Sequence, residues 1–131
     1  MVVVTDLLTV ARKLNNYEAD ATGGTLWTST TTFKCTVPVG KRWEFLFGYH
    51  KRDVSSTALV EIRDVSDDII GSLDYQGAAT AGVGYPNTSA GNNTLPKGRV
   101  VLDVGEYILI TFGTAQGVGA YASCVVLEVD V

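Results

Sequence analysis

The sequence predicts an all-β protein built as an antiparallel β-sandwich, and three observations lead to this prediction. The chain has 131 residues, which is enough for one domain with its own hydrophobic core. It contains 18 Val, 15 Thr and 5 Ile residues, which favour strands, and 14 Gly residues that punctuate them. Several short segments alternate between apolar and polar residues, the pattern of a strand with one buried face.

Residues 1–24 differ from the rest and are predicted to form an N-terminal arm, with the sandwich domain covering residues 25–131. Apolar residues between positions 7 and 14 follow a helical spacing, whereas residues 2–4 suit a strand equally well. Residues 15–24 are rich in Asn, Asp, Thr and Gly, as in a linker. The alternative, which the sequence leaves open, is a terminal strand or helix packed on its own domain.

The strands of the domain follow in order, each with one apolar face. They are expected within residues 30–39, 43–49, 57–63, 69–73, 100–102, 106–113 and 120–131. Their inward positions are expected to meet in one core, made of Trp43, Phe45, Phe47, Val60, Ile62, Ile108, Ile110, Phe112, Val125 and Leu127. Outward apolar positions predict a surface that other subunits cover, at Leu46, Leu59, Tyr107 and Leu109.

A weak internal repeat links two of these strands. Residues 40–48, Gly-Lys-Arg-Trp-Glu-Phe-Leu-Phe-Gly, align without a gap on residues 105–113, Gly-Glu-Tyr-Ile-Leu-Ile-Thr-Phe-Gly. The inward apolar positions coincide in the two copies. Two halves of a sandwich that each send a strand out of a glycine bend into a shared core would give this pattern, and chance similarity is the alternative.

Residues 75–96 are the least usual segment of the chain. They contain no charged residue, and Gly, Ala, Thr, Asn and Ser predominate. A loop of this length is usually functional or disordered, and disordered segments tend to carry charge. The composition therefore favours packing against another protein surface, with a floppy surface loop as the alternative.

Net charge and residue counts argue against several classes of function. A net charge of −4 and a pI near 4.8 argue against binding to nucleic acid, which needs a surplus of Lys and Arg. No segment approaches the roughly 18 consecutive apolar residues of a membrane helix, and residues 1–14 make a poor signal peptide. One His and two Cys are too few for a zinc site, so neither a metal nor a cofactor is expected.

Catalytic constellations are equally scarce, so the protein is not expected to be an enzyme. His50, the one imidazole, is interpreted as part of the charged end of a strand, and no pair of carboxylates stands out by context. Cys35 and Cys124 are interpreted as small apolar residues packed within strands, reduced in a cytoplasm.

Charge is distributed unevenly along the chain. Residues 34–63 hold six basic and three acidic side chains, whereas residues 64–131 hold two basic and eight acidic ones. If the two stretches surface on different sides, the subunit is electrostatically polar, which favours oriented docking. Interleaved strands that cancel the asymmetry are the alternative.

Four segments together resemble the small jelly-roll proteins of tailed-bacteriophage virions. They are a bend at residues 37–40 (Val-Pro-Val-Gly), an aromatic strand at 41–48, the passage 52–60, and residues 102–110, Leu-Asp-Val-Gly-Glu-Tyr-Ile-Leu-Ile. Members of this broad group decorate capsids as trimers or form the head domains of fibres. The resemblance implies a jelly-roll fold, and it carries over no functional residue because the group is defined by shape.

The expected function is structural: a capsid decoration or cement protein that binds the outer surface of a phage capsid as a homotrimer. The expected partner is the major capsid protein, without nucleic acid, membrane or cofactor, and the chain would be made in the host cytoplasm and located on the virion. Candidate contacts to the capsid or to neighbouring subunits lie in the arm and in the neutral segment, at Val3, Leu7, Leu8, Val10, Val83, Tyr85 and Leu95.

The alternative function is a glycan- or receptor-binding module of a phage fibre or tail. Such a module needs exposed aromatic rings that stack on sugar rings, and the candidates are Trp27, Trp43 and Tyr85. Burial of Trp43 would remove the best of them.

Overall fold

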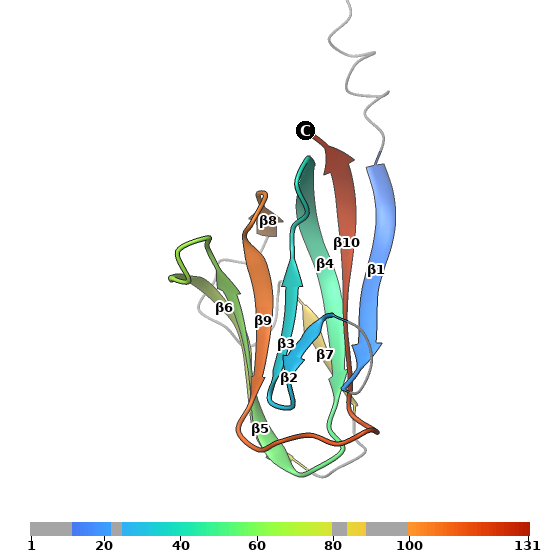
Figure 1. Cartoon of the computed structure of the whole chain (residues 1–131), viewed down its shortest axis with the longest axis vertical. Helices are drawn as coiled ribbons and strands as arrows, with labels where there is room; N and C mark the ends of the chain where they lie inside the picture. Colours follow the sequence, from blue (N-terminus) through green and yellow to red (C-terminus); the bar gives the residue numbers. More distant parts are fainter. Residues whose placement is uncertain (1–11, 22–24, 80–83, 89–99) are drawn as a thin grey trace, which may run out of the picture.

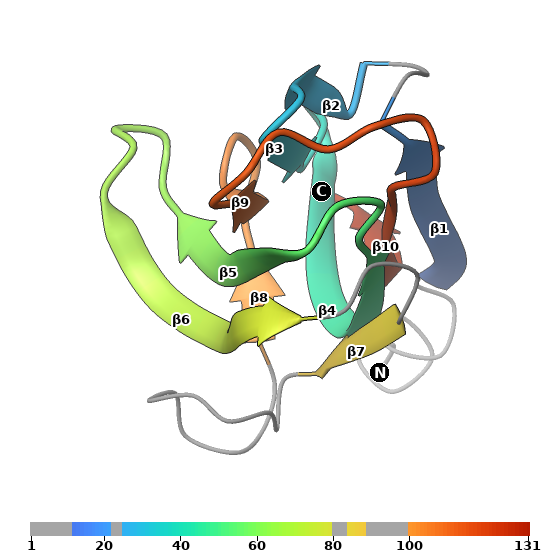
Figure 2. The ribbon, with the colours of Figure 1, turned by 90° about the horizontal axis from the view of Figure 1, so that it is seen from below.

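The computed structural model describes residues 12–21, 25–79, 84–88 and 100–131. Every regular element in these ranges is a β-strand, and the strands form two antiparallel sheets packed face to face (Figure 1). The end-on view separates the two layers (Figure 2). The all-β sandwich predicted from the sequence is therefore confirmed.

The first sheet, called sheet A, has the strand order β1-β10-β4-β7, and β8 also pairs with β4. Its strands are β1 (Arg12–Asp20), β10 (Tyr121–Asp130), β4 (Lys41–Lys51), β7 (Gly84–Thr88) and β8 (Val100–Leu102). Strands β7 and β8 pair with successive parts of β4, so together they form one edge of the sheet. The opposite edge is β1.

The second sheet, called sheet B, has the strand order β2-β3-β9-β5-β6. Its strands are β2 (Trp27–Ser29), β3 (Thr32–Thr36), β9 (Tyr107–Phe112), β5 (Ser56–Arg63) and β6 (Ile69–Ala79). The chain crosses between the sheets from β1 to β2, β3 to β4, β4 to β5, β6 to β7, β8 to β9 and β9 to β10. Each sheet has five strands. If β7 and β8 count as one edge strand and the short β2 is set aside, two four-stranded sheets remain, which is the topology of a jelly roll.

Strand β1 corrects the expected boundary between arm and domain. Arg12–Asp20 pairs with β10 along its whole length, from Arg12 opposite Val129 to Asp20 opposite Tyr121. Residues 12–20 are thus part of the sandwich and do not belong to the separate arm that was predicted over residues 1–24. The polar composition that suggested a linker belongs to an edge strand, whose outer side faces solvent. Residues 1–11 lie outside the described part of the chain.

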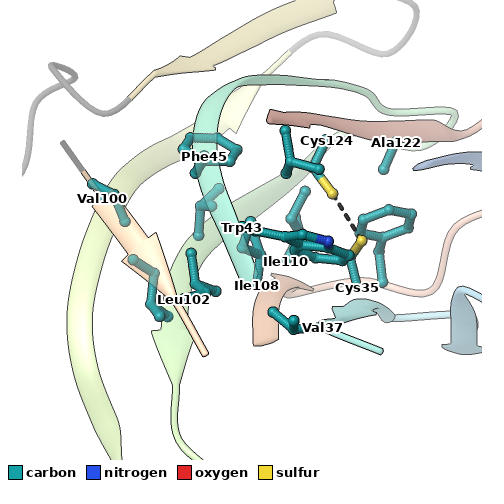
Figure 3. Close-up of a cluster of buried hydrophobic side chains, with 14 of the residues drawn as sticks. Cys35, Val37, Trp43, Phe45, Val100, Leu102, Ile108, Ile110, Ala122 and Cys124 are labelled. Carbon is teal, nitrogen blue, oxygen red and sulfur yellow. Dashed lines mark hydrogen bonds between the residues drawn. The ribbon is translucent and has the colours of Figure 1, made fainter. Parts of the chain in front are cut away.

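The core lies between the two sheets and contains most of the predicted residues (Figure 3). Trp43 and Phe45 come from sheet A, and sheet B faces them with aliphatic and aromatic side chains. The predicted members that are buried in this cluster are Trp43, Phe45, Val60, Ile62, Ile108, Ile110 and Phe112. The remaining three predicted members, Phe47, Val125 and Leu127, lie on the other side of sheet A.

A β-bulge in β4 explains why Phe47 points outward. Val125 and Val126 are consecutive in β10 and pair with Phe47 and Phe45, so Leu46 is an extra residue in β4. An extra residue reverses the alternation of side chains beyond it. Trp43 and Phe45 therefore face the core before the bulge, and Gly48 and His50 face it afterwards. Phe47 and Tyr49 are left on the outer face.

In β10 the inward residues are small. The core cluster includes Ala122, Cys124 and Val126, with Glu128 on the same face. The alternate residues Val125 and Leu127 carry larger side chains and were expected to be inside, but they face outward. Both faces of β10 are largely apolar, so alternation alone does not show which one is the core.

The internal repeat corresponds to two equivalent turns. Gly40 and Gly105 both have positive φ, of 80° and 84°, and each turn is closed by a backbone hydrogen bond, from Lys41 to Pro38 and from Glu106 to Asp103. Only glycine adopts this conformation without strain. The turns lead into β4 and β9, which are interior strands of opposite sheets. The bend positions coincide as predicted, and the copies diverge at the bulge in β4.

The bulge predicts which aromatic residue of β4 supports the fold. Phe45→Ala and Ile110→Ala should each lower the free energy of unfolding by about 2 to 5 kcal/mol, because each opens a cavity in the core. Phe47→Ala should cost under about 1 kcal/mol, because this ring is half exposed. Urea denaturation of the three variants measures the difference. Equal losses at Phe45 and Phe47 would contradict the reversed alternation.

Candidate docking face of sheet A

The outer face of sheet A carries large exposed apolar side chains. Phe47 and Tyr49 of β4 have 49% and 37% of their surface exposed. Leu14 of the edge strand β1 is 64% exposed, and Val101 of β8 is 48% exposed. A folded monomer seldom leaves so many large apolar residues together in water.

The strand register places these residues on one continuous surface. Leu14 is opposite Leu127, which pairs with Glu44, which in turn pairs with Val101. One row further along, Phe47 is opposite Val125. We call this surface the apolar patch. It consists of the exposed Leu14, Phe47, Tyr49 and Val101, the half-buried Leu127 and the buried Val125.

Polar side chains share this face with the apolar patch. Glu44 lies between Leu127 and Val101, and Asn16 and Ser123 lie opposite Val125 and Tyr49. The rings of Tyr49 and Tyr121 lie with their centroids 5.9 Å apart. The hydroxyl of Tyr121 donates a hydrogen bond to Glu18 of β1. The register places the apolar patch across the width of sheet A, from β1 over β10 and β4 to β8.

The outer face of sheet B carries both charged and apolar side chains. Arg63 donates to the Glu61 carboxylate at 3.1 Å and to the backbone oxygen of Asp67 at 3.0 Å. Lys34 lies 4.1 Å from the centre of the Tyr107 ring, and the hydroxyl of Tyr107 donates to Asp67. Ile69 of β6, which is opposite Arg63, is 56% exposed.

The exposed apolar residues differ from those expected. Leu46, Leu59 and Leu109 are half-buried and Tyr107 is buried, so they do not form the predicted exposed surface. Among the exposed large apolar residues, Leu14, Phe47, Tyr49 and Val101 lie on sheet A, and Ile69 and Ile70 lie on β6 of sheet B. Phe47 was predicted in the core and Leu14 in the arm.

Both segments that were expected to make contacts are partly strands. Residues 12–20 of the predicted arm form β1. The neutral segment 75–96 was predicted as one loop, but residues 75–79 lie in β6 of sheet B and residues 84–88 form β7 of sheet A. Thr88 ends β7 opposite Phe47, and Val100 begins β8 opposite Phe45. Residues 89–99 lie outside the described residues.

The seven predicted contact residues are distributed as follows. Tyr85 lies in β7 at the edge of sheet A, where its Cα partner is His50. The other six, Val3, Leu7, Leu8, Val10, Val83 and Leu95, lie outside the described residues. The residues of the apolar patch were not predicted as contacts, since nothing in the sequence marks the bulge that exposes Phe47 and Tyr49.

A buried carboxylate beneath the apolar patch ties β1 to the rest of sheet A. The Glu128 carboxylate accepts hydrogen bonds from the Tyr17 hydroxyl at 2.6 Å and from the Trp43 indole nitrogen at 2.7 Å. The rings of Tyr17 and Trp43 pack with centroids 4.8 Å apart. One acid thus connects β1, β10 and β4.

The hydrogen bonds set the protonation state of this group. Burial alone would raise the pKa of Glu128, but the bonds from Tyr17 and Trp43, the charge of Lys41 and a bond from Asn15 together lower it. Burial and the neighbouring Glu128 charge raise the pKa of Tyr17 above its usual value. Glu128 is therefore ionised and Tyr17 is neutral near pH 7, which is the combination that these hydrogen bonds need.

Three candidate residues for other functions, His50, Trp27 and Trp43, are buried. His50 is fully buried, with its Nε2 atom 3.2 Å from Arg52 Nη2. Trp43 is fully buried, and Trp27 is 8% exposed and stacks on Phe112. Neither tryptophan ring is therefore available to stack on a sugar, and Trp43 is lost as the best candidate of that hypothesis.

The described residues contain no group of three or more His, Cys, Asp or Glu side chains placed to hold a metal ion. Within the same part of the chain, no helix is long and apolar enough to cross a membrane.

Ion pairs connect the two stretches of opposite charge. Lys41 pairs with Asp130, Arg42 Nε lies 2.6 Å from Asp103, and Arg63 lies 3.6 Å from Asp67. Each pair joins a base from residues 34–63 to an acid from residues 64–131. At these sites the charges interleave, so they do not provide the polarity that the linear distribution would allow.

Comparison with known proteins found a similarity of fold. No protein-family model matches the chain, and no curated protein matches it in sequence. A solved structure with a similar arrangement is the cryo-EM structure of the virus-like particle of the giant freshwater prawn Macrobrachium rosenbergii extra small virus. The TM-score is 0.48 and the sequence identity is 11%, over 94% of this chain and 80% of that chain.

Glu128 predicts a specific response to acid. Because its pKa is lower in the folded state than the usual 4.5, its stabilisation is fully present above that pH and is lost as the pH falls further. Glu128→Gln should lower the free energy of unfolding at pH 7 by about 1 to 3 kcal/mol and should weaken the acid dependence. Urea denaturation between pH 7 and pH 3 measures both effects.

Asp130→Asn is the matched control for Glu128→Gln. Asp130 lies two residues along the same strand, but its ion pair with Lys41 is exposed, so its loss should cost under about 0.5 kcal/mol. Equal effects of the two substitutions would contradict the special role of the buried carboxylate.

Proposed function

We propose that this protein is a structural component of a virion, a decoration or cement protein that binds the outer surface of a phage capsid as a homotrimer. The observation that carries the proposal is the apolar patch on the outer face of sheet A, with Phe47 49% exposed and Leu14 64% exposed. The major capsid protein is the proposed partner. Sheet A faces the shell, and sheet B points to solvent.

The chemistry of the apolar patch supports docking to another protein. Aromatic side chains are enriched at the centres of protein interfaces, and Phe47 and Tyr49 lie in the middle of this surface. The patch stands on a hydrogen-bonded sheet whose other side is the packed core. Docking therefore orders few additional groups, which limits the entropic cost of binding.

A trimer suits this arrangement for a reason of symmetry. In a ring with one rotation axis, every subunit presents the same face toward the same side. Three copies of the apolar patch would then meet the shell together, and the gain in avidity would come without a new type of contact. The contact residues predicted from the sequence, in the N-terminal segment and in residues 75–96, would contact the shell or the neighbouring subunits.

The proposal is tested by mass spectrometry of purified virions. Peptides of this chain at hundreds of copies per particle would support a decoration protein. A handful of copies would instead place the chain in a fibre or tail and overturn decoration. Absence from the particle would overturn the structural role.

Two substitutions test the docking face directly. Phe47→Glu should leave the circular dichroism unchanged and the melting temperature within a few degrees, because this ring is half exposed. It should weaken binding to undecorated capsids by at least about tenfold, because the new carboxylate would be desolvated in the interface.

The matched control is Ile69→Glu, on strand β6 of sheet B. Ile69 is 56% exposed and pairs with Arg63, so a carboxylate there is tolerated. Capsid co-sedimentation compares the two variants with the unaltered chain. Equal binding by Phe47→Glu and the unaltered chain would exclude sheet A as the docking face.

A further inference from the structure

The two cysteines of the chain meet in the core. Cys35 lies on β3 of sheet B, and Cys124 lies 89 residues later on β10 of sheet A. Both side chains are buried, and they point toward each other across the sandwich (Figure 3). The distance between their sulfur atoms is 2.8 Å. The sequence pattern assigned both to strands and gave no sign that they would face each other.

The surrounding residues let the sheets approach at this point. Two sheets in a sandwich pack about 10 Å apart, which two short cysteine side chains hardly span. Here the cross-strand partner of Cys124 is Gly48, which has no side chain, and the next inward residue of β10 is Ala122. The inner face of sheet A is therefore hollowed by small residues around Cys124, and Cys35 can reach it.

We propose that Cys35 and Cys124 form an intramolecular disulfide that joins the two sheets once the protein leaves a reducing compartment. A disulfide has a sulfur–sulfur bond of about 2.05 Å, so the two atoms need to approach by less than about 1 Å. The oxidant is a small disulfide such as oxidised glutathione. One thiolate attacks it to form a mixed disulfide, the second cysteine displaces glutathione, and the products are the protein disulfide and two reduced glutathione molecules.

The same burial makes the reaction slow in the native state. The hydrogen bond with Cys124 and burial both raise the pKa of Cys35, so the reactive thiolate is rare. An oxidant also has no direct path to either sulfur. The bond is therefore expected to form during folding, or during transient opening of the sandwich.

The disulfide would stabilise the sandwich without changing its outer surface. It closes a loop that contains all of β4 to β9, the end of β3 and the start of β10, so it restricts the unfolded chain strongly. We expect the melting temperature to rise by about 10 °C on oxidation. The disulfide itself does not depend on the proposed function. Its use in a virion, where it would stabilise the protein after release from the host cytoplasm, rests on that function.

The test uses the full chain, purified under reducing conditions and divided into two samples. One sample keeps the reductant, and the other is incubated with oxidised glutathione in mild urea and returned to buffer. Both are then unfolded and alkylated, and their intact masses are measured. We expect the oxidised sample to take up no alkyl group, and its mass to be two hydrogen atoms below that of the unmodified reduced chain. It should remain monomeric, and its melting temperature should be higher than that of the reduced sample.

Cys35→Ala and Cys124→Ala are the controls, because each leaves one thiol without its partner. Neither variant should show a rise in melting temperature on oxidation, and each should take up one alkyl group or one glutathione. If either variant fails to fold, the comparison of the two samples of the unaltered chain still shows whether the disulfide forms. Two alkylated cysteines after oxidation, stable mixed disulfides with glutathione, or cross-linked dimers would each overturn the proposal, whatever virion analysis shows about the function.

Discussion

The extra residue in β4 is the constraint on which the rest of the structure depends. Leu46 has no partner in β10, and the two strands on the other edge of β4 also stop on either side of it. Before this position β4 places Trp43 and Phe45 in the core, and after it the same strand exposes Phe47 and Tyr49. One inserted residue therefore places two aromatic rings in the apolar patch.

The inner side of sheet A explains how such an apolar surface is held in place. On the inner side of the sheet, the Glu128 carboxylate accepts hydrogen bonds from Tyr17 and Trp43, and these bonds hold the edge strand β1 to the sheet. Small residues on the inward face of β10 let the sheets come together at Cys35 and Cys124. Sheet A is thus anchored from within by a buried acid and by close contact with sheet B.

The sequence predicted the class of fold well, for physical reasons that can be traced. Positions with a single apolar face, as in β9 with Ile108, Ile110 and Phe112, follow directly from alternation. The glycine turns before β4 and β9 were visible because positive φ at Gly40 and Gly105 leaves a mark on the sequence. Strand β1 was not predicted, since an edge strand with many polar residues has the composition of a linker. The bulge was not predicted either, because strands with apolar residues on both faces leave their register open. The docking face depends on that bulge and was therefore out of reach of the sequence.

The most direct test of this account is hydroxyl-radical footprinting of Phe47 and Tyr49 in the free chain and in purified virions. The account predicts that both rings are oxidised in the free chain and protected at least about fivefold in the particle, since a docked face excludes solvent. Ile69 on sheet B should react equally in both samples. Equal oxidation of Phe47 and Tyr49 in the free and assembled states would contradict the assignment of sheet A as the face that binds the shell.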